Sequence, residues 1–588
     1  MGVLKFFRYL SLKYPQCLHK LLGTIQACES ASSKGIYTEW LELDLNSIFH
    51  TVAQEVYQYG NKASFSVSLM HPKKISPPKN IPEETLFLEI CSRIEQIRKI
   101  IKPTKGIYFA TDGVAGFSKI AQQRKRRFKS CLDSDDKDDK DDKNKDNTSN
   151  TGKFDSNTSN TSGKFDSNCI STGTLFMERL SKYIDSFIQQ QIESNPEWKG
   201  LEIIISNYSV AGEGEQKCIE HMRKNSQLSY TVCSPDADLI FLELGLHNLN
   251  LYVFRENIFD DIDASFFLVD IGILRQCILK EIKMQDEKDE EKIKVIIEDF
   301  IVYCFFIGND FLPQIPSLNI TNDGIENIFL IYPKIIKEHG FISCKSGNNY
   351  SLRKEGMKAF LYEMSQIEYQ MIINNQKRNQ SRYPDTILKK YISYPIIKGK
   401  FRTSGLPERM LTIDFNKYII EYNKKKFNGV DIKIVVQEYF KGMTFVLKYY
   451  LNKIPSNRWC YPFHYAPFFK DLYAHIDDFD IDFKFEIGDI LSPYEQLLAI
   501  LPGKSAYLLP DKLQYLSTSA DSPIIDMFPI DFAVDLEGKK QDYEGIILIP
   551  HVNIDRLTTA FKDVENNLSE CDKMRNVPGN IREILIPI

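Results

Sequence analysis

Short apolar runs in the first half of the chain each stop at an acidic residue and are followed by a longer segment with helical spacing. The runs are WLELDL at Asp44, IYFAT before Asp112, LEIIIS before a GEGE segment, and YTVCSPDADL around Asp236. Short strands that alternate with longer helices are typical of an α/β sheet with helices on both faces. We therefore predict a doubly wound, mostly parallel sheet with acids at the carboxyl ends of its strands, where such sheets bind ligands.

The same patterning predicts the division of the chain. Residues 1–130 and 166–350 are expected to form two catalytic parts of one domain. Between them, residues 131–165 contain DSDDKDDKDDKNKDNTSN and two copies of GKFDSN, with almost no apolar side chain, so we predict a disordered insertion. Residues 351–588 are mostly helical in pattern and rich in aromatic residues, and we expect them to pack on the first region and complete the active-site pocket.

Composition adds little to this picture. The chain has 588 residues, a net charge of −5 and a pI near 6.1, so any basic surface that binds nucleic acid must be local. Its 12 cysteines are scattered without a C-x-x-C pair, which argues against a zinc module or a disulfide framework. With neither a secretory signal nor an apolar stretch of membrane-spanning length, we expect a soluble intracellular protein that does not bind membranes.

Seven acidic residues are the strongest candidates for chemistry. They are Asp44, Asp112, Glu213, Glu215, Asp236, Asp238 and Asp310. A single acid after a strand is more often a helix cap or a turn residue than a metal ligand. Two pairs change this balance, because Glu213 with Glu215 and Asp236 with Asp238 are spaced at i and i+2, which places both carboxylates on one side of an extended backbone.

Carboxylates this close repel each other unless a cation binds between them. Oxygen ligands of this kind suit magnesium, or manganese, so we predict a site for two ions. The chain shows no catalytic cysteine, no serine–histidine arrangement and no phosphate-binding loop. Metal-assisted hydrolysis of a phosphodiester is therefore the predicted reaction class, with one ion activating water and another stabilising the leaving oxygen.

A basic segment, GVAGFSKIAQQRKRRFKS, follows Asp112 directly. On a helix, Lys119, Gln123 and Arg126 share one face, and Arg127 lies beside them. Taken alone, such a run is more often a solvated face or a nuclear-localisation signal. Next to a predicted catalytic acid, we interpret the four residues as a pocket for a terminal phosphate. His50 and Trp459 are candidates to stack on bases, although lone aromatic residues usually belong to the core.

These motifs resemble the Xrn/Rat family of 5′→3′ exoribonucleases, in order along nearly the whole chain. The similar blocks include MGVLKFFRYLSLKYP, LELDLNSIFH, TDGVAGFSKIAQQRKRRF, VAGEGEQK, SPDADLI, FFIGNDFLPQIPSL, WCYPFHYAPF and SPIIDMFP. The resemblance implies that the seven acids are metal ligands and that Lys119, Gln123, Arg126 and Arg127 bind a 5′ phosphate. It also implies that His50 and Trp459 sandwich the bases of a single-stranded RNA with a 5′-monophosphate end.

The chain departs from the family pattern at a few positions, none of which removes an acid. Leu4 and Gly116-Phe117 stand where the family has Pro and Pro-Arg, Ser234-Pro235 replaces Gly-Leu, and Gln216 replaces His. The change at Gly116 and the insertion put the family's unwinding of duplexes and its partner contacts in question.

The resemblance also bears on location. The segments FFLVDIGILRQCILKEI and DFAVDLEGKK are more similar to the nuclear type of the family, so we expect a nuclear protein, with the cytoplasm as the alternative. A nuclear member would be expected to dock a pyrophosphohydrolase-type protein. Two other functions stay open: a structure-specific flap or repair nuclease acting on DNA, and an RNA-binding scaffold without catalysis.

Overall fold

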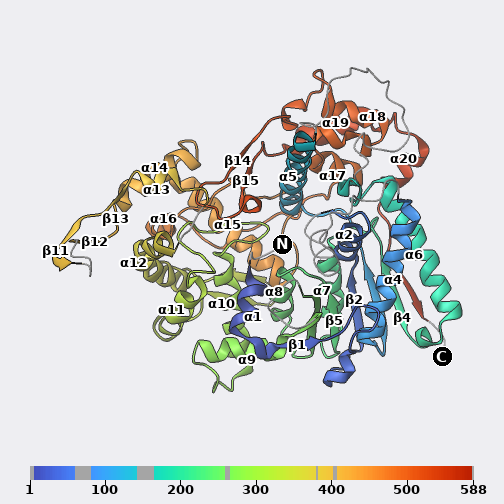
Figure 1. The fold of residues 1–588 in the computed structure, drawn as a ribbon, viewed down its shortest axis with the longest axis horizontal. Coiled ribbons are helices and arrows are strands. Elements are labelled where there is room, and N and C mark those ends of the chain that lie inside the picture. The colour runs from blue at the N-terminus through green and yellow to red at the C-terminus, as the bar shows by residue number, and fades with distance from the viewer. Residues whose placement is uncertain are drawn as a thin grey trace.

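An eight-stranded sheet forms the centre of the molecule (Figure 1). The computed structural model describes residues 5–59, 81–141, 165–257, 265–347, 349–378, 382–401 and 407–585. The strand order is β1-β7-β6-β5-β2-β3-β4-β16. The bounds are β1 Leu18–Leu21, β2 Trp40–Asp44, β3 Gly106–Ala110, β4 Glu202–Ser206, β5 Tyr230–Cys233, β6 Leu251–Glu256, β7 Phe266–Asp270 and β16 Arg582–Leu585.

The five strands from β6 to β4 pair in parallel, and β7, β1 and β16 add antiparallel edges. Helices cover both faces. One face packs against α2 (Leu45–Val56), α4 (Glu83–Ile101) and α6 (Leu175–Ser194), and the other against α7 (Gly214–Lys224), α8 (Asp238–Leu244) and α9 (Ile271–Glu281). The predicted doubly wound, mostly parallel sheet is confirmed.

The direction of winding reverses between β2 and β5. The chain runs outward from β2 to β3 and β4, then crosses back to place β5 on the other side of β2. A crevice opens at such a switch point, outside the carboxyl ends of the strands. Asp44 is the last residue of β2, Asp112 follows β3, and Ser234 follows β5 directly.

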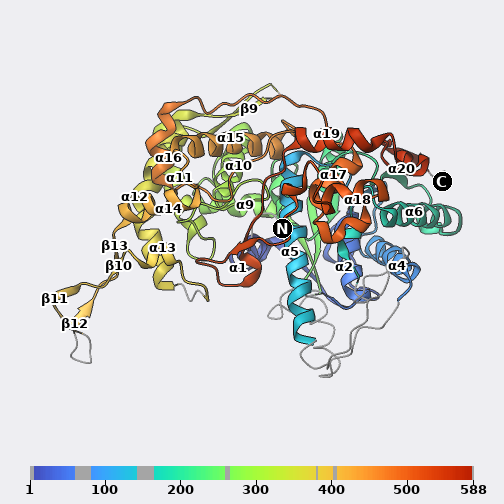
Figure 2. The same cartoon turned by 90° about the horizontal axis from the view of Figure 1, so that it is seen from above.

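Helix α5 (Phe117–Asp141) corrects one prediction. Disorder was expected from residue 131, but the helix continues to Asp141, and Figure 2 shows its far end projecting from the body of the molecule. A helix anchored by its first turns extends readily, because each further residue adds a hydrogen bond after nucleation is complete. The remainder of the predicted insertion, residues 142–164, lies outside the described residues.

The region after residue 350 is largely helical, as predicted. Its longer helices are α12 (Lys354–Arg378), α14 (Phe415–Lys426), α15 (Ile432–Leu451), α17 (Pro493–Ile500) and α19 (Ile554–Glu565). One apolar core joins α15 and α12 to α8 and to α10 (Glu290–Phe305) and α11 (Gly324–His339). A separate core packs α17 and α19 on the start of α5, so the C-terminal region contacts the basic helix.

Shorter elements complete the fold. In the described ranges, the remaining α-helices are α1 (Phe6–Lys13), α13 (Thr386–Lys389), α16 (Phe469–His475), α18 (Asp511–Thr518) and α20 (Glu570–Arg575). Four two-stranded sheets pair β8 (Ser343–Ser346) with β9 (Asn349–Leu352), β10 (Ile392–Ser393) with β13 (Thr412–Ile413), β11 (Ile396–Phe401) with β12 (Pro407–Arg409), and β14 (Ala533–Asp535) with β15 (Ile546–Leu548). Across the described ranges, no helix is both long and apolar enough to cross a bilayer.

Candidate active site

The starts of three helices position the predicted acids. Asp44 ends β2 and precedes α2, Glu213 precedes α7, and Asp238 is the first residue of α8. The partial positive charge of a helix N-terminus favours carboxylates at these places. Asp44 Oδ2 also accepts a hydrogen bond of 2.9 Å from Ser234 Oγ.

The reason given for the two acidic pairs was wrong. Gly214 is the first residue of α7, and Ala237 has helical dihedral angles of −77° and −24°, so neither pair lies in extended backbone. Each pair instead spans the entry into a helix. Glu213 and Glu215 are nevertheless both buried, because α7 starts against the sheet.

Gly214 allows this close approach. A Cβ atom at this position would lie 2.9 Å from Asp44 Oδ1 and 3.3 Å from the carbonyl oxygen of Ala110. The Gly214 N–H donates a hydrogen bond of 2.7 Å to Asp112 Oδ1. The glycine therefore brings the N-terminus of α7 between the acids that follow β2 and β3.

Lys119 lies among the carboxylates and not beside the other basic residues. Its Nζ is 2.6 Å from Glu213 Oε2, 2.8 Å from Asp310 Oδ2 and 3.4 Å from Glu215 Oε1. Burial by itself would lower the pKa of Lys119, but Asp310 and Glu213 raise it well above the usual value. The ammonium is thus held as a counter-ion for three acids from two segments of the chain, one with Glu213 and Glu215 and the other with Asp310.

Several of the carboxyl groups are unfavourable in their ionised form. Burial, and then Asp112, raises the pKa of Asp44 to about 7. Burial also raises the pKa of Glu215 and of Asp238 well above the usual value, with Asp310 contributing for Asp238. Desolvation and like charges both favour the protonated forms, so a bound cation would stabilise the ionised site.

The oxygen donors suit a hard divalent ion in their chemistry. Within the described residues, however, no three carboxylate, histidine or cysteine side chains converge closely enough to bind a metal. Lys119 Nζ lies between Glu213 and Asp310, at the place where such a convergence would be needed. The structure therefore brings the predicted ligands near one another without showing a coordination geometry.

A cavity of about 370 Å³ connects the acids to the basic helix. Its acidic wall is formed by Asp44, Asp112, Glu213, Glu215 and Asp236, and other lining residues include His50, Lys119, Gln123, Arg126 and Arg127. Asp238 and Asp310 do not line it. One cavity thus contains most of the residues that the sequence singled out.

The two arginines of this cavity are held differently. Arg127 is buried and donates to Asn168 Oδ1 at 3.1 Å and to the Ile170 carbonyl at 3.3 Å. Arg126 makes no hydrogen bond or ion pair with any described side chain or carbonyl. Arg126 is therefore the guanidinium of this cavity that has no partner among the described residues.

Sequence reasoning missed polar residues that support this pocket. Asn168 Nδ2 donates to Ser505 Oγ at 3.0 Å, which ties the wall beside Arg127 to the C-terminal region. Asn46 Oδ1 accepts from the Asp112 N–H at 3.0 Å. Asn46 could have been suspected from its place two residues after Asp44, whereas nothing in the sequence connects Asn168 with Ser505.

Of the two candidates for base stacking, only His50 lines this cavity. Burial, followed by Arg126, lowers the pKa of His50 to about 3, so the ring is neutral. Trp459 does not line the cavity. Its ring packs against Phe445, with centroids 4.7 Å apart, and against Phe485 at 5.9 Å. In the aromatic-rich segment, the Trp459 ring thus packs against other aromatic rings of the C-terminal region.

Comparison with known proteins identifies the relatives of this chain. Residues 1–257 match the Xrn 5′-3′ exonuclease N-terminus, and residues 290–393 and 408–586 match the Xrn1 helical domain. The chain belongs to the Xrn family. Nucleases of this family depend on metal in general.

Several Xrn relatives match over nearly the whole chain. It is 29% identical to human 5′-3′ exoribonuclease 1 over 98% of its length, but spans 35% of that protein. It is 27% identical to the 5′-3′ exoribonuclease 2 homolog of Drosophila melanogaster, with 99% of this chain and 73% of the relative covered. It is 28% identical to chicken 5′-3′ exoribonuclease 2, with 98% of this chain and 72% of the relative covered.

Three of the departures from the Xrn pattern, at Gly116, Phe117 and Ser234, have local explanations, whereas Leu4 lies outside the described residues. A Cβ atom at Gly116 would lie 2.3 Å from Ile454 Cδ1, so a larger residue would need this side chain to move. Phe117 is buried in the core that α17 and α19 form with α5. Ser234 uses its hydroxyl to hold Asp44.

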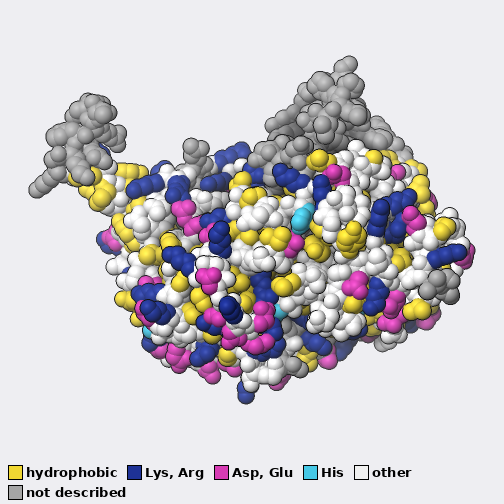
Figure 3. Space-filling view, turned by 90° about the horizontal axis from the view of Figure 1, so that it is seen from below, with side chains coloured by type: hydrophobic (Ala, Val, Ile, Leu, Met, Phe, Trp, Pro, Cys, Tyr) yellow, Lys and Arg dark blue, Asp and Glu magenta, His cyan; other side chains and the backbone are white. Residues whose placement is uncertain are grey.

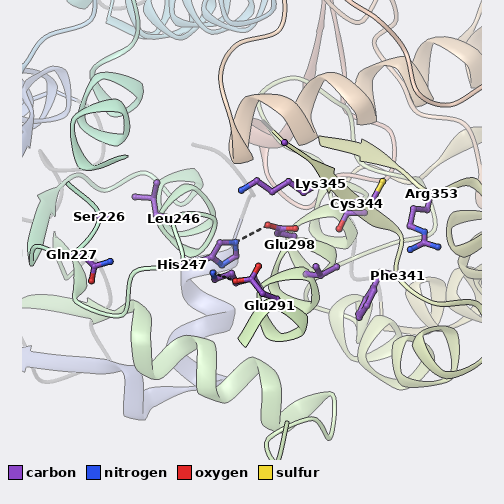
Figure 4. Close-up of a pocket in the computed structure, with 14 residues that line it drawn as sticks. Ser226, Gln227, Leu246, His247, Glu291, Glu298, Phe341, Cys344, Lys345 and Arg353 are labelled. Atoms are coloured by element: carbon purple, nitrogen blue, oxygen red, sulfur yellow. Dashed lines mark hydrogen bonds and ion pairs between the residues drawn. The ribbon is translucent and has the colours of Figure 1, made fainter. Parts of the chain in front are cut away.

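A second, larger cavity of about 650 Å³ lies at the other end of the sheet (Figure 4). It opens beside the segments that precede β5 and β6, and none of the seven acids lines it. It contains one polar pair, in which His247 Nε2 lies 3.0 Å from Glu298 Oε1, while His247 Nδ1 and Glu298 Oε2 have no hydrogen-bond partner among the described residues. Two of its cations, Lys345 and Arg353, are exposed.

Proposed function

We propose that the protein is a metal-dependent 5′→3′ exoribonuclease that hydrolyses single-stranded RNA from 5′-monophosphate ends and releases nucleoside 5′-monophosphates. One observation carries this proposal. A single cavity has buried carboxylates on one wall and the unpaired guanidinium of Arg126 on another, in a chain of the Xrn family. Such a cavity accommodates a terminal phosphate and presents the adjoining phosphodiester to the acids.

The seven acids would hold two divalent ions, magnesium or manganese. Bound there, the ions supply an activated water and stabilise the leaving oxygen. Lys119 neutralises Glu213, Glu215 and Asp310 in the metal-free protein, and a bound cation would compete with it for these carboxylates. Gly214 and Ser234 keep Asp112 and Asp44 in place through the hydrogen bonds described above.

Arg126 would bind the 5′ phosphate, with Gln123 as a further donor, since arginine recognises phosphate through several N–H groups at once. Arg127 would act mainly on the wall of the pocket, because its guanidinium donates to Asn168 and Ile170. The neutral ring of His50 is suited to stack on the first base. Each cleavage leaves a new 5′ monophosphate, which explains the direction of travel.

Localisation and partners belong to the proposal as well. We assign the protein to the nucleus because the segments FFLVDIGILRQCILKEI and DFAVDLEGKK are more similar to the nuclear type of the family. RNA processing or transcription termination is the process in which it would act there. A pyrophosphohydrolase-type protein is the partner expected there, since it would produce the monophosphate ends that the pocket selects.

End-labelled substrates test the proposal. RNA and DNA of one sequence, labelled at the 5′ or the 3′ end and carrying a monophosphate, a triphosphate or a hydroxyl, are incubated with and without magnesium. Release of mononucleotides from the 5′ end of monophosphorylated RNA alone, with magnesium, is the expected result. Preferential cleavage of branched DNA would favour a flap nuclease, and binding without hydrolysis would favour a scaffold.

A further inference from the structure

Helix α5 carries a run of basic residues that are engaged to different extents. Arg124 donates to two backbone carbonyls of the C-terminal region, and Lys129 donates to two others. Lys125, which lies between them in sequence, is half-buried and makes no hydrogen bond or ion pair with any residue in the described ranges. Its ammonium therefore has no protein counter-ion there.

The interaction partners of Lys125 are uncharged groups, although Glu438 also acts on one of them, Cys460. The side chains that interact electrostatically with it are Cys460 and the imidazoles of His464 and His551. The two imidazole rings are stacked, with centroids 4.9 Å apart and planes at 20°. Burial, and then Lys125, lowers the pKa of His464 to about 3 and that of His551 to about 4, so both rings are neutral near pH 7.

This cluster has unused binding capacity. A partly desolvated ammonium without a counter-ion is unfavourable, and an anion would relieve that cost. His464 Nδ1 is buried and lacks a hydrogen-bond partner among the described residues, whereas the ring of His551 is exposed. A cation next to an exposed flat ring is the combination with which proteins bind single-stranded nucleic acid, through a phosphate and a stacked base.

We propose that Lys125, His464 and His551 form a subsite for one nucleotide of the RNA strand, downstream of the 5′ end. Lys125 binds a phosphodiester, and the base stacks on His551. This inference rests on the proposed RNA substrate. The subsite is distinct from the cavity, because Lys125 and Arg126 are adjacent residues that point about 100° apart around α5. A strand seated at Arg126 passes around the helix to Lys125.

The charge pattern on the face that Figure 3 shows makes a specific subsite useful. The chain has a net charge of −5, and Figure 3 shows cationic side chains interspersed with acidic ones over the face it presents. Such a face offers no continuous basic band to hold a polyanion. Discrete contacts such as Lys125 then have to keep the strand bound between cleavage steps.

Binding measurements without metal test the subsite. Fluorescence anisotropy in EDTA compares 5′-phosphorylated RNAs of about 3 and about 12 nucleotides at several salt concentrations. Lys125→Ala is expected to weaken binding of the longer RNA by about 3- to 10-fold, and to make the dependence of log affinity on log salt shallower by about 0.7. Binding of the short RNA should not change.

Further variants separate the two contacts. His551→Ala should weaken binding of the longer RNA by about 5- to 10-fold with an unchanged salt slope, because it removes stacking and no charge. Lys125→Arg keeps the positive charge and should retain wild-type binding. If Lys125→Ala does not fold, Lys125→Gln, which removes only the charge, should show the same loss and the same change in salt slope. Lys337→Ala, an exposed lysine on α11, is the matched control and should behave as wild type.

An unchanged affinity and salt slope in folded Lys125→Ala would overturn the subsite, as would an equal loss for the short RNA. Failure of the proposed function is distinguishable. If the proposed function is wrong, the wild-type protein will not degrade 5′-phosphorylated RNA in the presence of magnesium. If only the subsite is wrong, the wild-type protein will still degrade this RNA.

Discussion

The two cavities at opposite ends of the central sheet differ in the charge and burial of the residues that line them. The larger one, about 650 Å³, is lined by exposed cations and by a His247–Glu298 pair whose hydrogen bond is made within the protein. The smaller one, about 370 Å³, has buried carboxylates on its wall that raise one another's pKa. Unfavourable burial of like charges, and not volume, distinguishes the end of the sheet that we propose as the active site.

The difference follows from topology. Carboxyl ends of parallel strands meet at one edge, and helices start there, so acids after β2, β3 and β5 converge with helix N-termini behind them. At the opposite edge the chain enters the strands through exposed turns such as Ser226–Gln227. Selection for stability alone would not retain so many desolvated carboxylates in one place.

The largest expected effect is on hydrolysis. Asp236→Asn or Glu213→Gln should lower the rate on 5′-phosphorylated RNA by about 1,000-fold or more, since each removes charge from the proposed ion site. A variant with both changes should lose little more than either alone. Glu298→Gln, in the larger cavity, should stay within about twofold of wild type. Equal losses in both cavities would remove the distinction between them.

The next effect concerns stability. Lys119→Met leaves Glu213 and Asp310 buried without their counter-ion, so the metal-free protein should lose about 3–5 kcal/mol of unfolding free energy. Magnesium should restore much of it by replacing the lost charge. Denaturation with and without magnesium measures this, with Lys99→Met on α4, an exposed position, as the control. A metal-free stability equal to wild type would show that Lys119 is not needed as a counter-ion.

A smaller effect separates the two arginines of the active cavity. Arg126→Ala should reduce the preference for 5′-monophosphate over 5′-hydroxyl RNA by about 10- to 100-fold, because it removes charged hydrogen bonds to the terminal phosphate. Arg127→Ala should reduce the preference less and the melting temperature more, since Arg127 is bonded to Asn168 and Ile170. The ratio of kcat/KM values on the two ends measures this. A reversed order would assign the phosphate to Arg127.

The smallest effect is a pH dependence. The raised pKa of Asp44, about 7, means that its carboxyl group is protonated below that pH and ionised above it. An ion that binds there must displace the proton, so the magnesium concentration needed for half-maximal activity should rise by about tenfold per pH unit below 7 and level off above. A flat profile between about pH 6 and pH 8 would contradict the assignment of Asp44 as a ligand.

Much of this architecture can be predicted from the sequence, because the strands and the acid at the end of each strand depend on local patterns. The doubly wound sheet and the position of Asp44 at the end of β2 are examples. The pairing of Glu213 with Glu215 was identified for the wrong reason, since helix entry at Gly214 depends on tertiary contact with β2.

Contacts between distant segments could not be predicted. The ion pairs of Lys119 join three segments, and Asn168 meets Ser505 only because the C-terminal region folds back onto α5. The contact of the half-buried Trp459 ring with Phe445 could not be predicted either, and its stacking on a base stays a prediction.

Manganese binding tests the central claim most directly, because it requires neither RNA nor turnover. Free Mn²⁺ is followed by electron paramagnetic resonance during titration of wild type, Asp236→Asn and Glu298→Gln. Wild type and Glu298→Gln should bind the ion saturably, and Asp236→Asn should bind it far more weakly. Equal binding by Asp236→Asn and wild type would show that the carboxylates at the ends of β2, β3 and β5 do not form the metal site.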